Sequence, residues 1–192
     1  MTGSETLTPA SPVEAPAFYV GSEVGRLRKV LVHRPDLSLQ RLTPSNVRDL
    51  LFDDVLWVRR AREQHDVFVD HLRDRGVEVY LLRDLLSETL TSSEEARREI
   101  VGRVVTERTV GASLRDEIRA YLLEMNPDDL ATHLIGGLEW TEMEGLDLSG
   151  SLMARAGSET SFVLPPLPNS LFTRDSSSWI YNGVTLNPMY FS

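Results

Sequence analysis

Apolar and polar residues follow two different periods along the first part of the chain. Residues 27–33 combine alternation with a β-branched apolar run that Arg34-Pro35 interrupts, which predicts a strand. A helix is predicted over residues 55–75, because apolar side chains recur there at spacings of three and four. Gly76 predicts the end of this helix, and residues 77–82 predict a second strand. The opening region is therefore expected to be an α/β unit.

The region after residue 83 shows only the helical period. A capping box is predicted within residues 92–95, and Ser113 is expected to cap a further helix. Pro127 predicts the first residue of another helix, which the glycines at 136–137 end. Consecutive helices without an intervening strand predict a small bundle inserted into the α/β body.

The end of the chain predicts a short strand, an irregular loop and a hairpin. Residues 162–164 are apolar, and the prolines within 165–169 argue against regular structure there. Residues 179–181 and 184–186 flank an Asn-Gly dipeptide, which tolerates the positive φ values of a type I′ turn. We therefore expect a β-hairpin with this dipeptide at its tip.

Composition narrows the classes of function. The 192 residues carry a net charge of -9 and contain no cysteine. Acidic character argues against nucleic acid as a partner, and the missing thiol excludes a disulfide, a thiolate metal ligand and a cysteine nucleophile within these residues. No apolar run approaches the ~20 residues of a membrane span, so no membrane partner is expected. Residues 1–16 predict a disordered polar tail rather than a secretory signal.

The residues best suited to chemistry lie in and just after the proline loop. Asn169, Phe172 and Asp175 offer an amide, an aromatic ring and a carboxylate at spacings of three. A carboxylate matches a guanidinium, a planar cation, through paired charge-assisted hydrogen bonds. Each residue also has an ordinary alternative. Asn169 and Asp175 suit turns, Phe172 suits a core, and Arg174 with Asp175 suits an exposed ion pair.

Two long strings in a fixed order resemble the arginine deiminases. They are RLTPSNVRDLLFDDVLWV near the start and LPPLPNSLFTRDSSSWIYNGVTLNPM near the end. The resemblance covers nearly everything after residue 17 and implies an α/β fold of the pentein type, a five-bladed α/β propeller. It implies a first propeller module at 17–83, an inserted helical bundle at 84–148, and the truncated start of the next module at 149–192.

The resemblance also implies an activity. Arginine deiminases hydrolyse L-arginine to L-citrulline and ammonia through a covalent cysteine intermediate, without a metal or organic cofactor. Asp175 is then expected to hold the substrate guanidinium, with Asn169 and Phe172 lining the pocket and Leu51 contacting substrate, although Leu51 also suits a core. The nucleophilic cysteine, the histidine and two further carboxylates have no counterpart here. We therefore expect an N-terminal fragment that is inactive alone, from a cytoplasmic enzyme that forms homo-oligomers when complete.

Other interpretations remain. One is a non-catalytic module that binds arginine or a protein partner. Another is an amidinotransferase or dimethylarginine hydrolase, which the helical insertion at 84–148 disfavours. Asp53 and Asp54 are expected to cap the helix that follows them. Four histidines are expected to be packed or solvated rather than catalytic: His33, His65, His71 and His133.

Overall fold

A computed structural model describes residues 18–143 and 162–187. The chain divides into two compact units, one spanning residues 27–173 and the other combining 1–26 with 174–192. Helices and strands are mixed, as expected, and the described residues form three two-stranded sheets, none of them closed. The five-bladed propeller stays a prediction, as does the expected division into modules. The predicted disordered tail, residues 1–16, lies outside the described residues.

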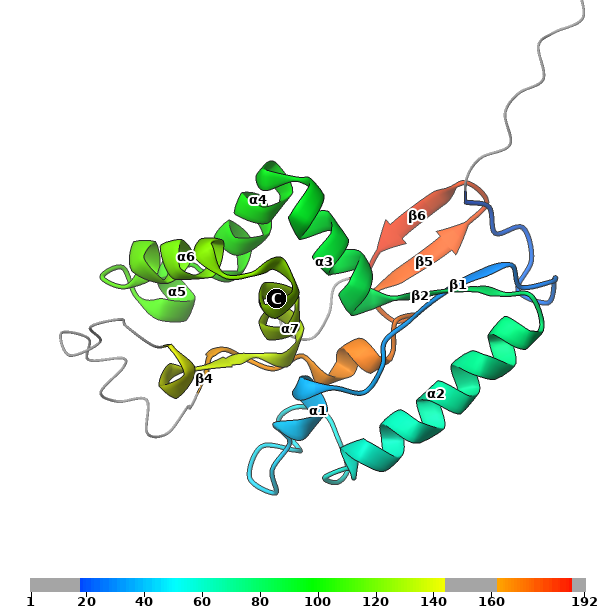
Figure 1. The fold of residues 1–192 in the computed structure, drawn as a ribbon, viewed down its shortest axis with the longest axis horizontal. Helices are drawn as coiled ribbons and strands as arrows, with labels where there is room; N and C mark the ends of the chain where they lie inside the picture. Colours follow the sequence, from blue (N-terminus) through cyan, green and yellow to red (C-terminus); the bar gives the residue numbers. More distant parts are fainter. Residues whose placement is uncertain (1–17, 144–161, 188–192) are drawn as a thin grey trace, which may run out of the picture. The chain divides into compact units, whose positions relative to one another are not determined.

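The larger unit opens with the predicted strand–helix–strand arrangement. Strand β1 (Lys29–Val32) leads through α2 (Val58–Asp74) to β2 (Glu78–Leu81), and the two strands pair in parallel (Figure 1). Gly76 has φ of 75°, a left-handed conformation that lets the chain leave α2 without the steric cost of a Cβ atom. The predicted order of strand, helix and strand is confirmed.

The predicted start of α2 is wrong, and so is the predicted role of the two aspartates before it. The N-cap residue is Trp57, whose side chain makes no capping hydrogen bond. Asp54 Oδ1 instead accepts a hydrogen bond from the Val55 N–H at 2.7 Å. Asp53 and Asp54 thus precede the cap position by three residues or more and do not cap this helix.

Consecutive helices follow β2, as predicted. They are α3 (Leu82–Ser92), α4 (Glu94–Val104), α5 (Glu107–Val110), α6 (Arg115–Glu124) and α7 (Pro127–Gly136). Helix α3 packs against α7 (Figure 1). We define the helical core as the buried cluster that these helices share with the short strands beside them, including Leu90, Val101, Val105, Val110, Ile118, Leu122, Leu130 and Ala131. Burial of this apolar surface is what holds the helices together.

Two predicted helix caps are wrong. The N-cap of α4 is Ser93, which accepts from the Ala96 N–H at 3.1 Å, so the predicted box is displaced by one residue and has no acidic side chain at its third position. Ser113 does not cap α6, whose N-cap position is Leu114. The Leu114 side chain is buried in the helical core, so packing decides this helix start. The start of α7 at Pro127 is confirmed.

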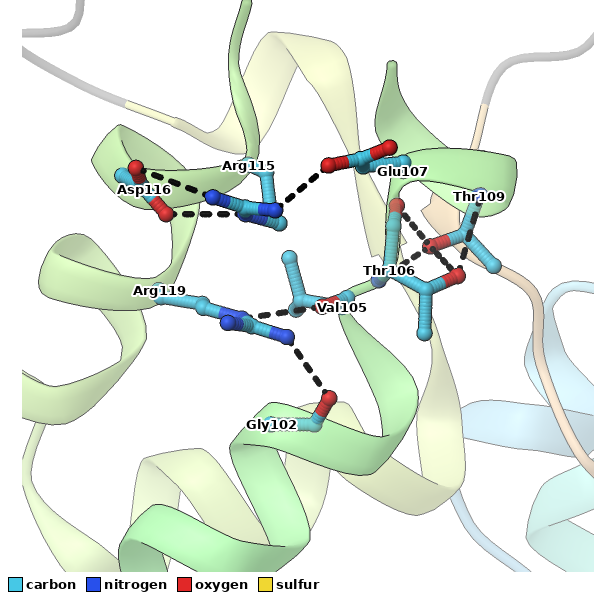
Figure 2. Close-up of polar contacts among 8 residues, drawn as sticks. All are labelled: Gly102, Val105, Thr106, Glu107, Thr109, Arg115, Asp116 and Arg119. Atoms are coloured by element: carbon cyan, nitrogen blue, oxygen red, sulfur yellow. Dashed lines mark hydrogen bonds and ion pairs between the residues drawn. The ribbon is translucent and has the colours of Figure 1, made fainter. Parts of the chain in front are cut away.

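Arginine side chains fasten α4, α5 and α6 to one another (Figure 2). Arg119 donates to the carbonyl oxygens of Gly102 and Val105, each at 2.9 Å. These carbonyls lie at the C-terminal end of α4, where the helix itself offers no donor to them. Arg115 contacts Glu107 of α5 at 2.6 Å. These contacts explain why a helix as short as α5 keeps its place between two longer ones.

Short elements connect the helices to the proline loop. Strand β3 (Leu138–Glu139), which the sequence pattern did not predict, pairs antiparallel with the predicted strand β4 (Phe162–Leu164). A single 3-10 turn, η2 (Pro168–Leu171), occupies part of the loop that was predicted to be irregular. Gly137 permits close packing here, because a Cβ on it would lie 2.8 Å from the Pro166 nitrogen.

The smaller unit contains the predicted hairpin with its tip displaced by one residue. Strands β5 (Ser177–Ile180) and β6 (Gly183–Leu186) pair antiparallel, with Ile180 opposite Gly183. The tip is therefore Tyr181 with Asn182, and Tyr181 takes the positive φ, at 51°. Val20 explains the shift, because its N–H and carbonyl both hydrogen-bond to the backbone of Tyr181 at 2.8 Å.

Candidate functional site

Two loop segments that are far apart in the sequence meet in the larger unit. The Asn169 side-chain amide donates to the Leu50 carbonyl oxygen at 2.9 Å. The rings of Phe52 and Phe172 lie 6.3 Å apart between centroids, tilted by 30°. Leu51 stands between Leu50 and Phe52 in the chain. The structure thus brings together the loops that hold three of the predicted site residues, Leu51, Asn169 and Phe172.

Short-range contacts shape the loop around Asn169. Pro168 is buried and starts η2, where its fixed φ suits the first helical position. The Phe172 N–H then donates to the Asn169 carbonyl oxygen at 3.0 Å. Phe172 itself is 51% exposed, so its alternative role as a core ring is excluded within the described fold. The amide and the ring are therefore held on one turn, with the ring facing outward from the core.

Hydrogen bonds at both ends tie this loop to regular elements. On one side, the Leu167 N–H donates to the Ile135 carbonyl oxygen of α7 at 2.9 Å. On the other side, the Thr173 hydroxyl donates to the Leu31 carbonyl oxygen of β1 at 2.9 Å. A loop anchored to a helix and a strand presents its side chains more rigidly than a free one.

Leu51 adopts an unusual backbone conformation. Its φ is 63°, which costs a non-glycine residue about 1–2 kcal/mol. Two backbone hydrogen bonds hold this conformation. The Leu51 N–H donates to the Arg48 carbonyl oxygen at 3.0 Å, and the Phe52 N–H donates to the Val47 carbonyl oxygen at 2.9 Å. The Leu51 side chain is 57% exposed, so this leucine is not a core residue. A strained, exposed leucine is a pattern that suits a binding surface better than packing.

A small apolar cluster supports the two loops from beneath. Helix α1 (Leu37–Gln40) contributes Leu39, which is buried together with Leu42 and Val47. Partly buried side chains from both loops pack on these three: Leu50, Phe52 and Leu171. Asn46 closes the turn above α1, since its Oδ1 accepts from the Thr43 N–H at 2.8 Å.

The buried Arg41 forms ion pairs, which sequence reasoning missed, that connect α1 to the short elements after α7. Arg41 contacts Glu139 at 2.9 Å and Glu142 at 2.6 Å, and its guanidinium lies 5.3 Å from the centroid of the Phe162 ring. Burial acts to raise the pKa of Glu142, but the Glu139 backbone N–H and the Arg41 guanidinium outweigh it, so this pKa is lowered. Nothing local in the sequence signals the pair, because its partners are distant along the chain.

Asp175 belongs to the smaller unit, and its environment is described there. It is exposed and lies just before β5, where its carbonyl oxygen accepts from the Asn187 side-chain amide at 3.0 Å. Arg174 pairs with Glu23 at 2.6 Å, which argues against the alternative of an Arg174–Asp175 ion pair. The open end of the hairpin therefore presents the carboxylate to solvent.

Two of the histidines, the buried His33 and the half-buried His65, have a pKa below the ordinary value and are neutral near pH 7. Burial lowers the pKa of His33, more than the Asp36 carboxylate raises it, and His65 lowers it further. Burial also lowers the pKa of His65, against the opposing effect of Asp66. Neither has a described contact with the two candidate loops. The described residues offer no cluster of three metal-ligating side chains, and none of their helices is long and apolar enough to cross a bilayer.

Comparison with known protein families gives a match to this chain. The model of the family described as arginine deiminase matches residues 48–192, about three quarters of the chain. The matched region includes the Leu51 turn, the Asn169 loop and the hairpin that begins after Asp175.

Proposed function

The chain belongs to the arginine deiminase family, and from this premise we propose that it supplies the substrate-binding part of an enzyme that hydrolyses L-arginine to L-citrulline and ammonia. The family match over residues 48–192 is the observation that supports this proposal most strongly. The contact between the Asn169 and Leu51 loops adds to it, because it forms a supported, partly apolar surface with a polar acceptor.

The substrate guanidinium calls for a carboxylate and a neutral acceptor. In the proposed site, Asp175 accepts two of its N–H groups, a bidentate arrangement that a planar cation and a carboxylate both favour. The Asn169 amide nitrogen already donates to Leu50, so the amide oxygen is the atom we assign to the substrate. The exposed side chains of Phe172 and Leu51 offer apolar surface for the methylene stem of arginine.

The bond-breaking chemistry requires groups outside these residues. In the proposed reaction a cysteine thiolate attacks the guanidinium carbon and ammonia leaves, after which water attacks the same carbon and releases citrulline with the thiol. A histidine moves the protons, and two further carboxylates help to hold the substrate. The 192 residues contain no cysteine, so the thiolate must come from another part of the protein or another chain.

The same family premise gives the proposed architecture of the complete enzyme. We place residues 17–83 in the first module of a five-bladed propeller, residues 84–148 in a helical insertion, and residues 149–192 at the start of the next module. We further propose a cytoplasmic homo-oligomer that needs no cofactor. The strand–helix–strand unit and the run of helices α3 to α7 are compatible with this arrangement.

A second candidate is a non-catalytic module that binds arginine or a partner protein. The absence of cysteine from all 192 residues is the observation that favours it. Such a module would retain the Asn169, Phe172 and Leu51 surface and the Asp175 carboxylate, but would release no ammonia.

The intact gene product distinguishes the two candidates. Its mass, measured after isolation from its own cells, is compared with the 21.6 kDa of these residues, and its conversion of carbon-labelled arginine to citrulline is followed. A larger mass with citrulline formation supports the deiminase. A mass of 21.6 kDa with binding heat from arginine but no citrulline supports the module. If arginine produces no citrulline and no binding heat, both candidate functions are contradicted.

The 192-residue chain provides the control for the missing thiol. By itself it is expected to form no citrulline above a buffer blank, because no nucleophile is present. Sustained turnover by this chain would contradict the covalent cysteine route.

A further inference from the structure

The turn that carries Leu51 is built around one residue, Asn46. The Asn46 Oδ1 accepts a hydrogen bond from the Thr43 N–H at 2.8 Å, and its Nδ2 donates to the Arg41 carbonyl oxygen at 2.9 Å. The backbone takes part as well, because the Asn46 carbonyl oxygen accepts from the Leu50 N–H at 3.0 Å. Asn46 thus connects the chain on both sides of it, from Arg41 to Leu50.

The start of this turn is fixed to the rest of the larger unit. Arg41 is buried, and its guanidinium pairs with Glu139 at 2.9 Å and with Glu142 at 2.6 Å. The hydrogen bond from the Asn46 side chain to the Arg41 carbonyl oxygen is partly buried. Such a bond is stronger than one in water, because the local dielectric constant is lower. Asn46 therefore holds the turn against an anchored segment.

The end of the turn reaches the candidate site. The Leu50 carbonyl oxygen accepts from the Asn169 side-chain amide at 2.9 Å. This contact occupies the amide nitrogen, so it also sets the direction of the amide oxygen, which we assign to the substrate. Leu51 follows with a φ of 63°, a conformation that persists only where surrounding contacts impose it. A shift of the turn would therefore move the acceptor that orients Asn169.

We propose that Asn46 is a positioning residue for arginine binding. It sets the place of the Leu50 carbonyl oxygen, which in turn orients the Asn169 amide toward the substrate. Asn46 acts without touching arginine, since both polar groups of its side chain have protein partners. The proposal rests on the proposed function, because it concerns the site that we assign to the guanidinium.

The alternative is that Asn46 serves the fold alone. Asparagine often stabilises a turn by bonding to nearby backbone groups, whatever the turn supports. In that case its replacement lowers stability, and any effect on arginine binding is independent of Asn169. The two roles therefore differ in whether the effects of Asn46 and Asn169 are coupled.

The substitution Asn46→Ala in the intact gene product measures the positioning role. It removes both side-chain hydrogen bonds, and we expect KM for arginine to rise about tenfold with kcat unchanged, because substrate binding is weakened and bond breaking is not. Asn46→Asp keeps the acceptor for the Thr43 N–H and loses the donor to Arg41, so a rise of about threefold is expected.

Asn126→Ala is the matched control. The Asn126 side chain also accepts from a backbone N–H, that of Asp128 at 2.9 Å, but it does so at the start of α7. This variant should lower the urea midpoint, because a helix cap is lost, and should leave KM unchanged. A KM that rises equally in Asn126→Ala and Asn46→Ala overturns the proposal, because loss of stability alone then explains both.

A double-mutant cycle with Asn169→Ala separates positioning from general stability. Removing the Asn169 amide takes away the group through which Asn46 acts, so Asn46→Ala should then raise KM by no more than about twofold. An equal rise in both backgrounds, or an unchanged KM in Asn46→Ala alone, overturns the proposal. If urea unfolding shows that Asn46→Ala does not fold, the cycle is made with Asn46→Asp, whose threefold effect should disappear in the Asn169→Ala background.

The unsubstituted protein distinguishes failure of this proposal from failure of the proposed function. If it neither binds nor converts arginine, the proposed function is wrong and the positioning role is overturned with it. If it converts arginine and Asn46→Ala has the same KM, the positioning role alone is overturned.

Discussion

The helical core and the hairpin after Asp175 differ in how far their side chains are buried. In the helical core, Val105, Ile118 and Leu122 are fully buried. In the hairpin, no residue of β5 or β6 is buried, and Leu186 is 83% exposed. A two-stranded hairpin is marginally stable by itself. The proposed guanidinium-binding carboxylate thus borders an element that is held by strand pairing and by the backbone contact with Val20 rather than by a buried core.

Replacing a core leucine should have the largest effect. Leu122→Ala is expected to lower the free energy of unfolding by about 3 kcal/mol, because it removes apolar contacts and leaves a cavity. Leu186→Ala, in the hairpin, should change it by less than about 0.5 kcal/mol. Urea denaturation of both variants measures the difference. Equal effects would show that the hairpin packs against a core of its own.

The buried Arg41 pair should come next. Arg41→Ala is expected to lower the free energy of unfolding by about 2 kcal/mol, since it strands two carboxylates that are only partly solvated. Arg103→Ala is the control, because the Arg103–Glu99 pair is exposed on α4 and should contribute at most about 0.5 kcal/mol. If both variants unfold at the same urea concentration, the Arg41 ion pairs do not hold α1 to η1 (Trp140–Glu142).

Two substitutions at Leu51 distinguish the effect of its strained backbone conformation from the effect of its side chain. Leu51→Gly is expected to raise the free energy of unfolding by about 1 kcal/mol, because glycine adopts a φ of 63° without a Cβ clash. Leu51→Ala keeps the clash and should leave stability nearly unchanged. Both variants should weaken arginine binding in the intact gene product, measured by calorimetry. Full affinity in either variant would remove Leu51 from the site.

The smallest effect expected is the pH dependence of stability that arises from His33 and His65. His33 and His65 have folded-state pKa values below the usual 6.5, so the unfolded chain binds more protons just below that pH. Their contribution to stability is fully present above pH 6.5 and is lost as the pH falls through the folded-state pKa values. Urea midpoints measured from pH 7 to pH 5 should decrease. Replacing both by glutamine should flatten this decrease, whereas His71→Gln, at an exposed position of α2, should not.

Local sequence patterns predicted the longer elements, but neither their exact ends nor the short strand β3. The apolar period of α2 and the proline at the start of α7 were sufficient to predict these two helices, because both signals act within one or two helical turns. The hairpin tip was displaced because Val20, from the other end of the chain, sets the backbone of Tyr181. Asp53 and Asp54 suit a helix cap by composition, but the chain continues in a non-helical conformation to Trp57 before α2 starts.

In the candidate site, too, local sequence patterns could not predict contacts between residues that are far apart in the chain. Composition alone left Asn169 and Phe172 with ordinary alternatives, and the contact from Asn169 to Leu50 joins residues that no local pattern relates. The resemblance pointed to both loops, since it rests on two separated strings in a fixed order. The buried Arg41 pair had no such signal, because burial is a property of the folded chain.

The central claim is that Asp175 holds the guanidinium of arginine, and one substitution tests it most directly. Asp175→Asn in the intact gene product is expected to lower kcat/KM for citrulline formation by about 10²–10³-fold, because it removes a charge-assisted bidentate contact. Asp70→Asn, an equally conservative change on the exposed face of α2, should leave it unchanged. Unchanged turnover in Asp175→Asn would contradict the assignment.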